Sequence, residues 1–197
     1  TAHHWARELA KLGHTVKLMP AGYVKAYVRR QKNDAADAAA ICEAVTRPSM
    51  RFVPVKTVEQ QAGLMLHRSR DLLIRQRTQL INALRAHLAE LGLVAATGVD
   101  GLKALLTIVR DAGEPRKLPE SMLQSLQALI DQLAALQEQI RMLERNIHAQ
   151  HRASEASRRL ETIPGIGVIG ATAIAATVSD PTAFKSGREL AAWIGLV

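Results

Sequence analysis

Hydrophobic side chains recur at intervals of three and four residues through the most regular stretch of the sequence. This spacing continues from Met122 to Ile147, over about four heptads. A strict a/d seam of this kind predicts a coiled-coil helix whose apolar stripe packs against a partner. The seam consists of Met122, Leu126, Leu129, Leu133, Leu136, Ile140, Leu143 and Ile147.

A second long helix is predicted from about Val58 to Leu91, with Gly92 ending it. Its apolar seam is poorer, because charged or polar side chains interrupt the leucines; they are Arg70, Arg77 and His87. The simplest arrangement pairs this helix with the 122–147 helix as an antiparallel hairpin, and dimerisation through the 122–147 seam is the alternative. A shorter helix is expected near 102–112, followed by a proline-bounded loop.

The first part of the chain predicts alternating short elements. A helix is expected over residues 1–12, a short strand over 14–19, and a helix over 21–30. A further helix should begin after Asn33, a good N-cap residue. A single strand forms no sheet, so its partner strands are expected outside this chain. The first 46 residues are therefore interpreted as part of an α/β domain within a mainly α protein.

Composition narrows the class of protein. Aromatic residues make up only 3% of the chain, which favours packed helices over β-sandwiches. The single cysteine, Cys42, excludes a disulfide framework and is expected to be buried, as are Trp5 and Trp193. No apolar run approaches the ~20 residues of a membrane-spanning helix. The sequence also lacks the signatures of P-loop nucleotide hydrolases, zinc proteases and α/β-hydrolases.

Positive charge is concentrated in the N-terminal half. The chain has 26 Lys and Arg against 18 Asp and Glu, a formal net charge of +8. Residues 1–32 and 47–92 are strongly basic, whereas residues 120–147 are acidic overall. A polyanion, most commonly a nucleic acid, is therefore expected to meet the N-terminal half. The alternative is an ordinary solvated surface.

Two tracts carry candidate chemistry, an acidic pair near residue 34 and a glycine-containing turn near residue 165. Asp34 and Asp37 lie three apart on a predicted helix, so their carboxylates share one face and can hold Mg²⁺ if other ligands converge there. The alternative is that they offset the helix dipole. His148 and His151, also three apart, have no evident partner ligand and are expected to be solvated.

The tract 160–174 fits a helix-hairpin-helix pattern. Gly165, Ile166 and Gly167 form a turn that leads into a helix, whose free backbone N–H groups can meet a DNA phosphate. The alternative to DNA contact is a tight helix corner that requires glycine for packing. Val168 and Ile169 replace the usual basic residue of the pattern, although two arginines lie just upstream. Those arginines, which compensate in the DNA-binding interpretation, are Arg158 and Arg159.

Several tracts taken together resemble the bacterial insertion-sequence transposases of the IS one-ten class, the DEDD recombinases directed by a bridge RNA. The most specific is Lys32–Ala38. The full set is residues 2–9, 23–38, 47–56, 76–78, 163–167 and 191–196. The resemblance covers essentially the whole chain. It implies a RuvC-like (RNase-H-type) region in residues 1–46, a linker in 47–57, a coiled-coil region in 58–152, and the start of a C-terminal transposase domain in 153–197.

The resemblance also implies a chemistry. Four acidic residues of the family bind Mg²⁺ at the phosphodiester, and a serine attacks the DNA; Asp34 and Asp37 match the last two acids. The first two acids and the serine have no counterpart here, since Ser186 comes too early in the pattern. We therefore expect an internal fragment that binds DNA and structured guide RNA and self-associates through its coiled coil, without catalysis. Its expected location is the cytoplasm, on the nucleoid when DNA-bound.

The expected nucleic-acid contacts are Arg29, Arg30 and Lys32, the glycine turn at 165–167, and Arg158 and Arg159. Two other functions fit the same residues. One is a non-catalytic coiled-coil adaptor or decoy that dimerises with intact transposase. The other is a structure-specific RuvC-like nuclease, which shares Asp34 and Asp37 but needs no serine.

Overall fold

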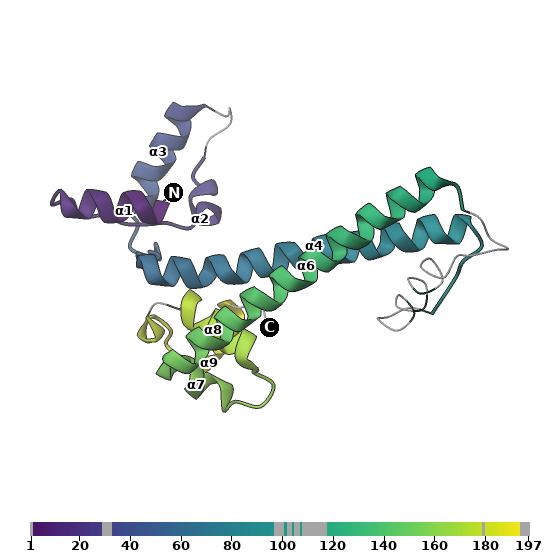
Figure 1. The fold of residues 1–197 in the computed structure, drawn as a ribbon. Helices are drawn as coiled ribbons and strands as arrows, with labels where there is room; N and C mark the ends of the chain where they lie inside the picture. Colours follow the sequence, from purple (N-terminus) through teal and green to yellow (C-terminus); the bar gives the residue numbers. More distant parts are fainter. Residues whose placement is uncertain are drawn as a thin grey trace. The chain divides into compact units, whose positions relative to one another are not determined.

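The computed structural model describes residues 2–28, 33–96, 118–178 and 180–193, together with the isolated positions 101, 104 and 107. The described residues are mainly helical, which confirms the predicted mainly α class (Figure 1). The chain divides into two compact units. One combines Thr1–Ala62 with Ala176–Val197, and the other is Gly63–Ala175. The predicted helix at 102–112 lies outside the described residues except for positions 104 and 107.

The first unit contains short helices whose ends follow the sequence signals. Helix α1 spans Ala2–Lys11 and ends before Gly13, which adopts a φ of 87° that favours glycine. Helix α2 is confined to Ala21–Lys25, and α3 spans Asp34–Val45. The C-terminal part of the unit adds a short 3₁₀ helix, η1 (Pro181–Ala183), and α9 (Gly187–Trp193).

The prediction of a strand at 14–19 is wrong, because these residues form no strand in the structure. Within the described residues, this segment forms only an isolated antiparallel bridge between Leu18 and Val53. The Val53 amide donates to the Leu18 carbonyl at 2.7 Å. Pro54 follows Val53 directly and has no N–H to donate, so the pairing has little room to extend.

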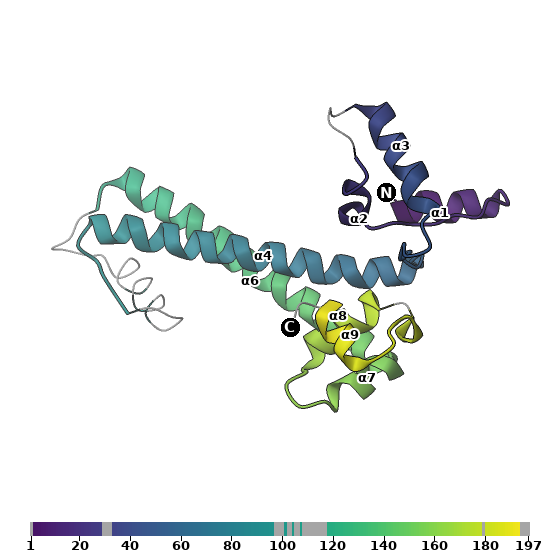
Figure 2. The same ribbon diagram turned by 180° about the vertical axis from the view of Figure 1, so that it is seen from behind.

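The second unit is built on two long antiparallel helices, α4 (Val58–Glu90) and α6 (Glu120–Ala153), which lie side by side in both views (Figures 1 and 2). Near the hairpin end their side chains form one apolar core. Its buried members are Leu84, Leu88, Leu93, Leu126, Ile130 and Leu133. This packing confirms the antiparallel hairpin as the arrangement of the two predicted helices.

The predicted seam is largely buried. Leu126, Leu133, Leu136, Ile140 and Ile147 are all buried in α6. Ile130 joins them although it lies outside the strict a/d pattern, because a core-facing helix buries a wider stripe than a coiled-coil seam does. Met122, at the start of the seam, remains largely exposed.

Arg70 explains one charged interruption of the α4 seam. Its Nε and Nη2 atoms lie 2.9 and 2.7 Å from the Glu144 carboxylate of α6. The pair joins the two helices in the same antiparallel register as the leucine core, since residues later in α4 meet residues earlier in α6. A cation in the seam is thus matched by an acid on the facing helix.

None of the helices that the structure describes carries an apolar stretch long enough to cross a lipid bilayer.

Candidate catalytic and nucleic-acid-binding sites

The acidic pair stands at a well-defined helix start. The Asn33 side chain accepts a hydrogen bond from the Ala36 amide at 2.7 Å, which confirms Asn33 as the N-cap of α3. Asp34 and Asp37 follow in the first turn, and both are exposed. The cap fixes the backbone from which both carboxylates project.

The donor set of this pair suits a hard cation but is incomplete. Carboxylate oxygens are ligands that Mg²⁺ accepts, and Mg²⁺ commonly uses one or two of them together with phosphate and water. Among the residues with described positions, no group of three His, Cys, Asp or Glu side chains is placed to hold a metal ion. Asp34 and Asp37 therefore fit part of a metal site, and their place also offsets the helix dipole.

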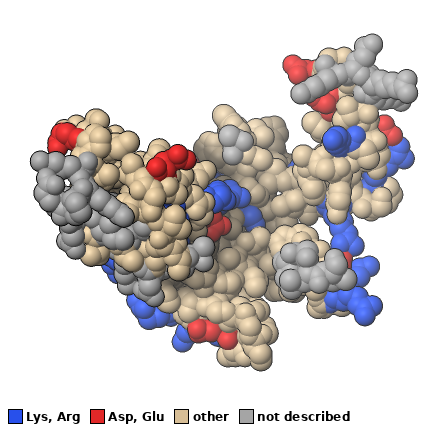
Figure 3. Space-filling model, turned by 90° about the vertical axis from the view of Figure 1, so that its right-hand side faces the viewer, with Lys and Arg blue, Asp and Glu red and all other residues tan. Residues whose placement is uncertain are grey.

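The basic residues expected just before the acidic pair are not placed. Arg29, Arg30 and Lys32 lie outside the described residues. On the face drawn in Figure 3, Lys and Arg side chains form several small groups, with acidic side chains beside some of them.

The glycine turn joins α7 (Glu155–Glu161) to α8 (Val168–Thr177). Gly165 has a φ of 88°, and a Cβ atom built on Gly165 or Gly167 meets nothing within 4 Å. An open hollow of about 500 Å³ lies over residues 165–170 and is also lined by His148 and Ile174. The turn is therefore sterically accessible from outside, which is a requirement for backbone contact with a phosphate.

Arg158 and Arg159 project from α7 just before this turn. Both are exposed, and neither forms an ion pair with any residue in the described ranges. Their guanidinium groups thus remain available to an anion near the glycine turn.

His151 was expected to be solvated, and this is wrong. The side chain is only 7% exposed. Its Nδ1 lies 2.9 Å from the Ser157 hydroxyl and its Nε2 lies 2.9 Å from the Glu161 carboxylate. These bonds join the end of α6 to the first turn and the last residue of α7. Ser157 is fully buried, so the triad is a structural link and not a nucleophilic site. The helix break at Ser154 hid this pairing from any periodic pattern.

The three expectations of burial are wrong in the opposite direction. Cys42 is exposed, and Trp5 and Trp193 leave more than half of their surfaces accessible among the described residues. The buried apolar residues described in the first unit are alanines (Ala6, Ala40 and Ala44), whose single methyl groups offer little surface to cover an indole ring.

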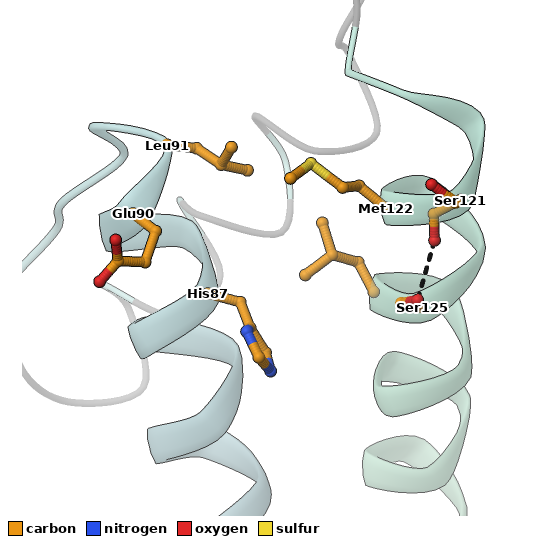
Figure 4. A pocket seen from close by; sticks show the side chains of 7 residues that line it. His87, Glu90, Leu91, Ser121, Met122 and Ser125 are labelled. Carbon is orange, nitrogen blue, oxygen red and sulfur yellow. Dashed lines mark hydrogen bonds between the residues drawn. The ribbon is translucent and has the colours of Figure 1, made fainter.

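A pocket of about 430 Å³ lies near the hairpin end of α4 and α6 (Figure 4). Met122 points into it from α6 and Leu91 from the turn that follows α4, and His87 and Glu90 contribute its titratable groups. Ser125 donates to the backbone carbonyl of Ser121 at 2.8 Å, so its hydroxyl is engaged within α6. The lining is mainly apolar and shows no catalytic arrangement.

His3 links α1 to the segment that precedes α4. Its Nδ1 atom accepts a hydrogen bond from the Lys56 amide at 3.1 Å. Arg7 reinforces the link by donating to the Lys56 carbonyl at 2.6 Å and to the Gln61 side chain at 2.7 Å. Burial, followed by the charges of Lys56 and Arg7, lowers the pKa of His3 below its ordinary value.

Acid is expected to destabilise the first unit through His3. Because the folded-state pKa is the lower one, the unfolded chain binds the proton more readily, and stability falls as pH drops below about 6.5. Protonated Nδ1 also no longer accepts from the Lys56 amide. Urea unfolding followed by tryptophan fluorescence at about pH 7.5 and 5.5 measures the effect, because Trp5 and Trp193 both belong to the first unit. His3→Asn, which keeps an acceptor but does not titrate, should reduce the loss. His4 is the exposed neighbour of His3, and His4→Asn should not reduce the loss of stability. Equal losses in the two variants would contradict the assignment of the pH effect to His3.

Comparison with known proteins gives a consistent result. A DEDD transposase model matches residues 2–92, and a model described as "Transposase IS116/IS110/IS902 family" matches residues 157–197. A putative transposase of Sinorhizobium fredii is 53% identical over 196 residues, covering 99% of this chain and 50% of that protein. A probable family 20 transposase of Pseudomonas aeruginosa is 50% identical over 198 residues, covering 100% of this chain and 58% of that protein.

A third relative, the transposase for insertion sequence element IS1328 of Yersinia enterocolitica, is 40% identical over 196 residues, covering 100% of this chain and 58% of that protein. The chain thus spans between half and three-fifths of the length of these relatives. No solved structure matches the chain.

Proposed function

Because the chain belongs to the IS116/IS110/IS902 family of insertion-sequence transposases, we propose that it supplies part of the DNA-cleaving and DNA-binding machinery of a transposase. The observation that carries the proposal is the capped start of α3, where Asp34 and Asp37 project together within the region that the DEDD model matches. The activity of the whole protein is Mg²⁺-dependent cleavage and rejoining of DNA strands.

In this proposal Asp34 and Asp37 hold Mg²⁺ together with phosphate oxygens and water. Bound Mg²⁺ stabilises the negative charge that develops at the phosphodiester. Asn33 keeps the first turn of α3 in place through its bond to the Ala36 amide, so the two carboxylates keep a common face. The other acids and the serine of the family pattern have no counterpart among these residues, so catalysis is proposed for the whole protein.

The turn between α7 and α8 is the proposed phosphate contact. Backbone amides at the start of α8 face the anion, and Gly165, Ile166 and Gly167 allow the close approach. Arg158 and Arg159 add positive charge from α7, and Arg29, Arg30 and Lys32 extend the contact near the acidic pair. Contacts of this kind position DNA without reading its sequence.

DNA and a structured guide RNA are the proposed partners, in the cytoplasm and on the nucleoid. Self-association is proposed as well, although the 122–147 seam cannot provide it unaltered, because α4 of the same chain covers Leu126 and Leu133. The adaptor hypothesis needs a free seam and gains no support from this packing. A RuvC-like nuclease without a serine domain is less consistent with the match to the transposase model over residues 157–197.

Replacing Arg158 and Arg159 together by Gln is expected to weaken binding to duplex DNA and to reduce the salt dependence of that binding. Each lost phosphate contact lowers the slope of log affinity against log salt by about one. Fluorescence anisotropy with a labelled duplex over a salt series measures both quantities. Arg68 and Arg75, exposed on α4, provide a matched double variant that should change the slope less.

Gly165→Val tests the turn itself, because the side chain is strained at a φ of 88° and fills the open approach. Losing charge-assisted bonds to a phosphate should weaken duplex binding by about 10- to 100-fold. Gly92→Val carries a similar strain at a φ of 73° away from the turn and should bind normally. Equal binding by both glycine variants would refute the phosphate contact.

A further inference from the structure

A cleft of about 670 Å³ in the first unit gathers most of the aromatic residues of the chain. The sequence contains only two Trp, two Tyr and two Phe, and four of these six line the cleft: Tyr23, Phe52, Phe184 and Trp193. They come from separate parts of the sequence and are brought together by the fold. Neither the acidic pair nor the glycine turn takes part.

The rings in this cleft are held in place but remain accessible. Phe184 packs edge-on against Trp193, with ring centroids 5.4 Å apart and an interplanar angle of 61°. Trp193 is nevertheless 52% exposed and Tyr23 is 53% exposed. An aromatic side chain that served only the core would be covered. The exposed ring faces instead provide flat apolar surfaces on which another planar group can stack.

Polar contacts join the walls of the cleft, and its lining contains more cationic than anionic side chains. Arg51 forms an ion pair with Glu189, and the Lys185 amide donates to the same carboxylate at 2.7 Å. The Lys185 amide bond, followed by the bond from Arg51, lowers the pKa of Glu189, so this carboxylate stays ionised and matched to its partners. Lys56 donates to the Thr177 carbonyl at 2.6 Å.

The exposed Lys185 ammonium forms no ion pair with a residue in the described ranges. Three cations therefore line the cleft against two acids, Asp180 and Glu189. The cations are Arg51, Lys56 and Lys185. The combination suits a ligand with a flat ring attached to an anionic group.

We propose that this cleft binds an unpaired nucleobase of a single-stranded nucleic acid, with the base stacked against Trp193 and its phosphates near Lys185. Single-strand binding proteins combine aromatic stacking surfaces with cationic grooves in this way. A paired base is stacked within its duplex and cannot enter without being extruded. The site thus goes beyond the proposed contact of the α7–α8 turn, which takes duplex phosphates and uses no aromatic ring.

The two tryptophans make stacking directly observable. In Trp5→Phe, Trp193 is the sole tryptophan, and its fluorescence should be quenched by an oligothymidylate of about ten nucleotides, a length within the site sizes of single-strand binding proteins. In Trp193→Phe, the remaining Trp5 should not be quenched. Oligouridylate of equal length shows whether the single strand is RNA or DNA. Stronger quenching by oligouridylate assigns the site to RNA, and stronger quenching by oligothymidylate assigns it to DNA.

Affinity gives the second readout. Trp193→Ala should weaken oligonucleotide binding by about 5- to 150-fold, the equivalent of one lost base stack. Trp5→Ala removes a tryptophan of the same unit that is also more than half exposed but lies outside the cleft, and this variant should bind within about twofold of the original chain. Lys185→Gln should retain the quenching while reducing the salt dependence of binding.

Absence of quenching in Trp5→Phe would overturn the proposal, as would equal quenching by duplex and single strand. An abasic oligomer that quenches as strongly would also overturn it, because phosphates alone would then explain the binding. The duplex-binding test of Gly165→Val is independent of these results, so the base site and the phosphate contact can fail separately. If Trp193→Ala does not fold, Trp193→Phe replaces it and should retain part of the affinity, since a phenyl ring still stacks.

Discussion

Asp34→Asn is expected to reduce DNA strand cleavage by more than about 100-fold, as is Asp37→Asn, since even residues that only support metal ligands cost about 10- to 100-fold when removed. The amide preserves the size of the side chain but lacks the negative charge that Mg²⁺ requires. Cleavage is measured in a chimera in which this chain replaces the matching part of the Sinorhizobium relative, over the 196 aligned residues.

Glu43→Gln is the matched control for this experiment. Glu43 lies in the last part of the same helix, where it pairs with Arg47, so its loss removes an acid of α3 without touching the first turn. If Asp34 and Asp37 serve only the helix dipole, their variants should lose up to about 1 kcal/mol of stability and keep cleavage. Activity within about tenfold of the unaltered chimera would therefore reject the catalytic assignment.

Leu88→Ala should lower the free energy of unfolding of the hairpin unit by about 2–5 kcal/mol. Leu88 is fully buried between α4 and α6, and the truncated side chain leaves a cavity among Leu84, Leu126 and Ile130. Chemical denaturation followed by circular dichroism measures the loss, because this unit contains the two longest helices among the described residues.

The same substitution at Leu72 separates packing from helix propensity. Leu72 lies in the same helix but is 48% exposed, so Leu72→Ala creates no buried cavity and should cost less than about 1 kcal/mol. A Leu88→Ala variant as stable as Leu72→Ala would show that the leucine core does not hold the two helices together.

The helices were predictable because their signals are local. The spacing of three and four residues identified α6, and the caps Asn33, Gly13 and Gly92 identified helix ends that the structure confirms. The antiparallel pairing of α4 and α6 was the simplest of two arrangements left open by the seams, and the structure selects it over dimerisation through the 122–147 seam. The missing strand at 14–19 shows the limit of such reasoning, since a strand depends on the hydrogen bonds of its partner, and Pro54 leaves Leu18 with a single bridge.

The candidate sites were predictable to different degrees. Asp34 and Asp37 were found from a short motif, although their role in catalysis remains a proposal. His151 was missed because its partners Ser157 and Glu161 lie beyond a break between two helices. The aromatic cleft was missed for a related reason: Tyr23 and Trp193 are far apart in the sequence and share no period, so only the tertiary structure brings them together.

The discontinuous first unit has a consequence for synthesis on the ribosome. More than half of the chain, Gly63–Ala175, separates its two parts in sequence. The contacts of Lys56 with Thr177 and of Arg51 with Glu189 therefore form only after the C-terminal residues have been translated. The hairpin contains its own core and can fold first, whereas the first unit is completed only by these later contacts. Completion of the first unit thus has to follow synthesis of the whole hairpin.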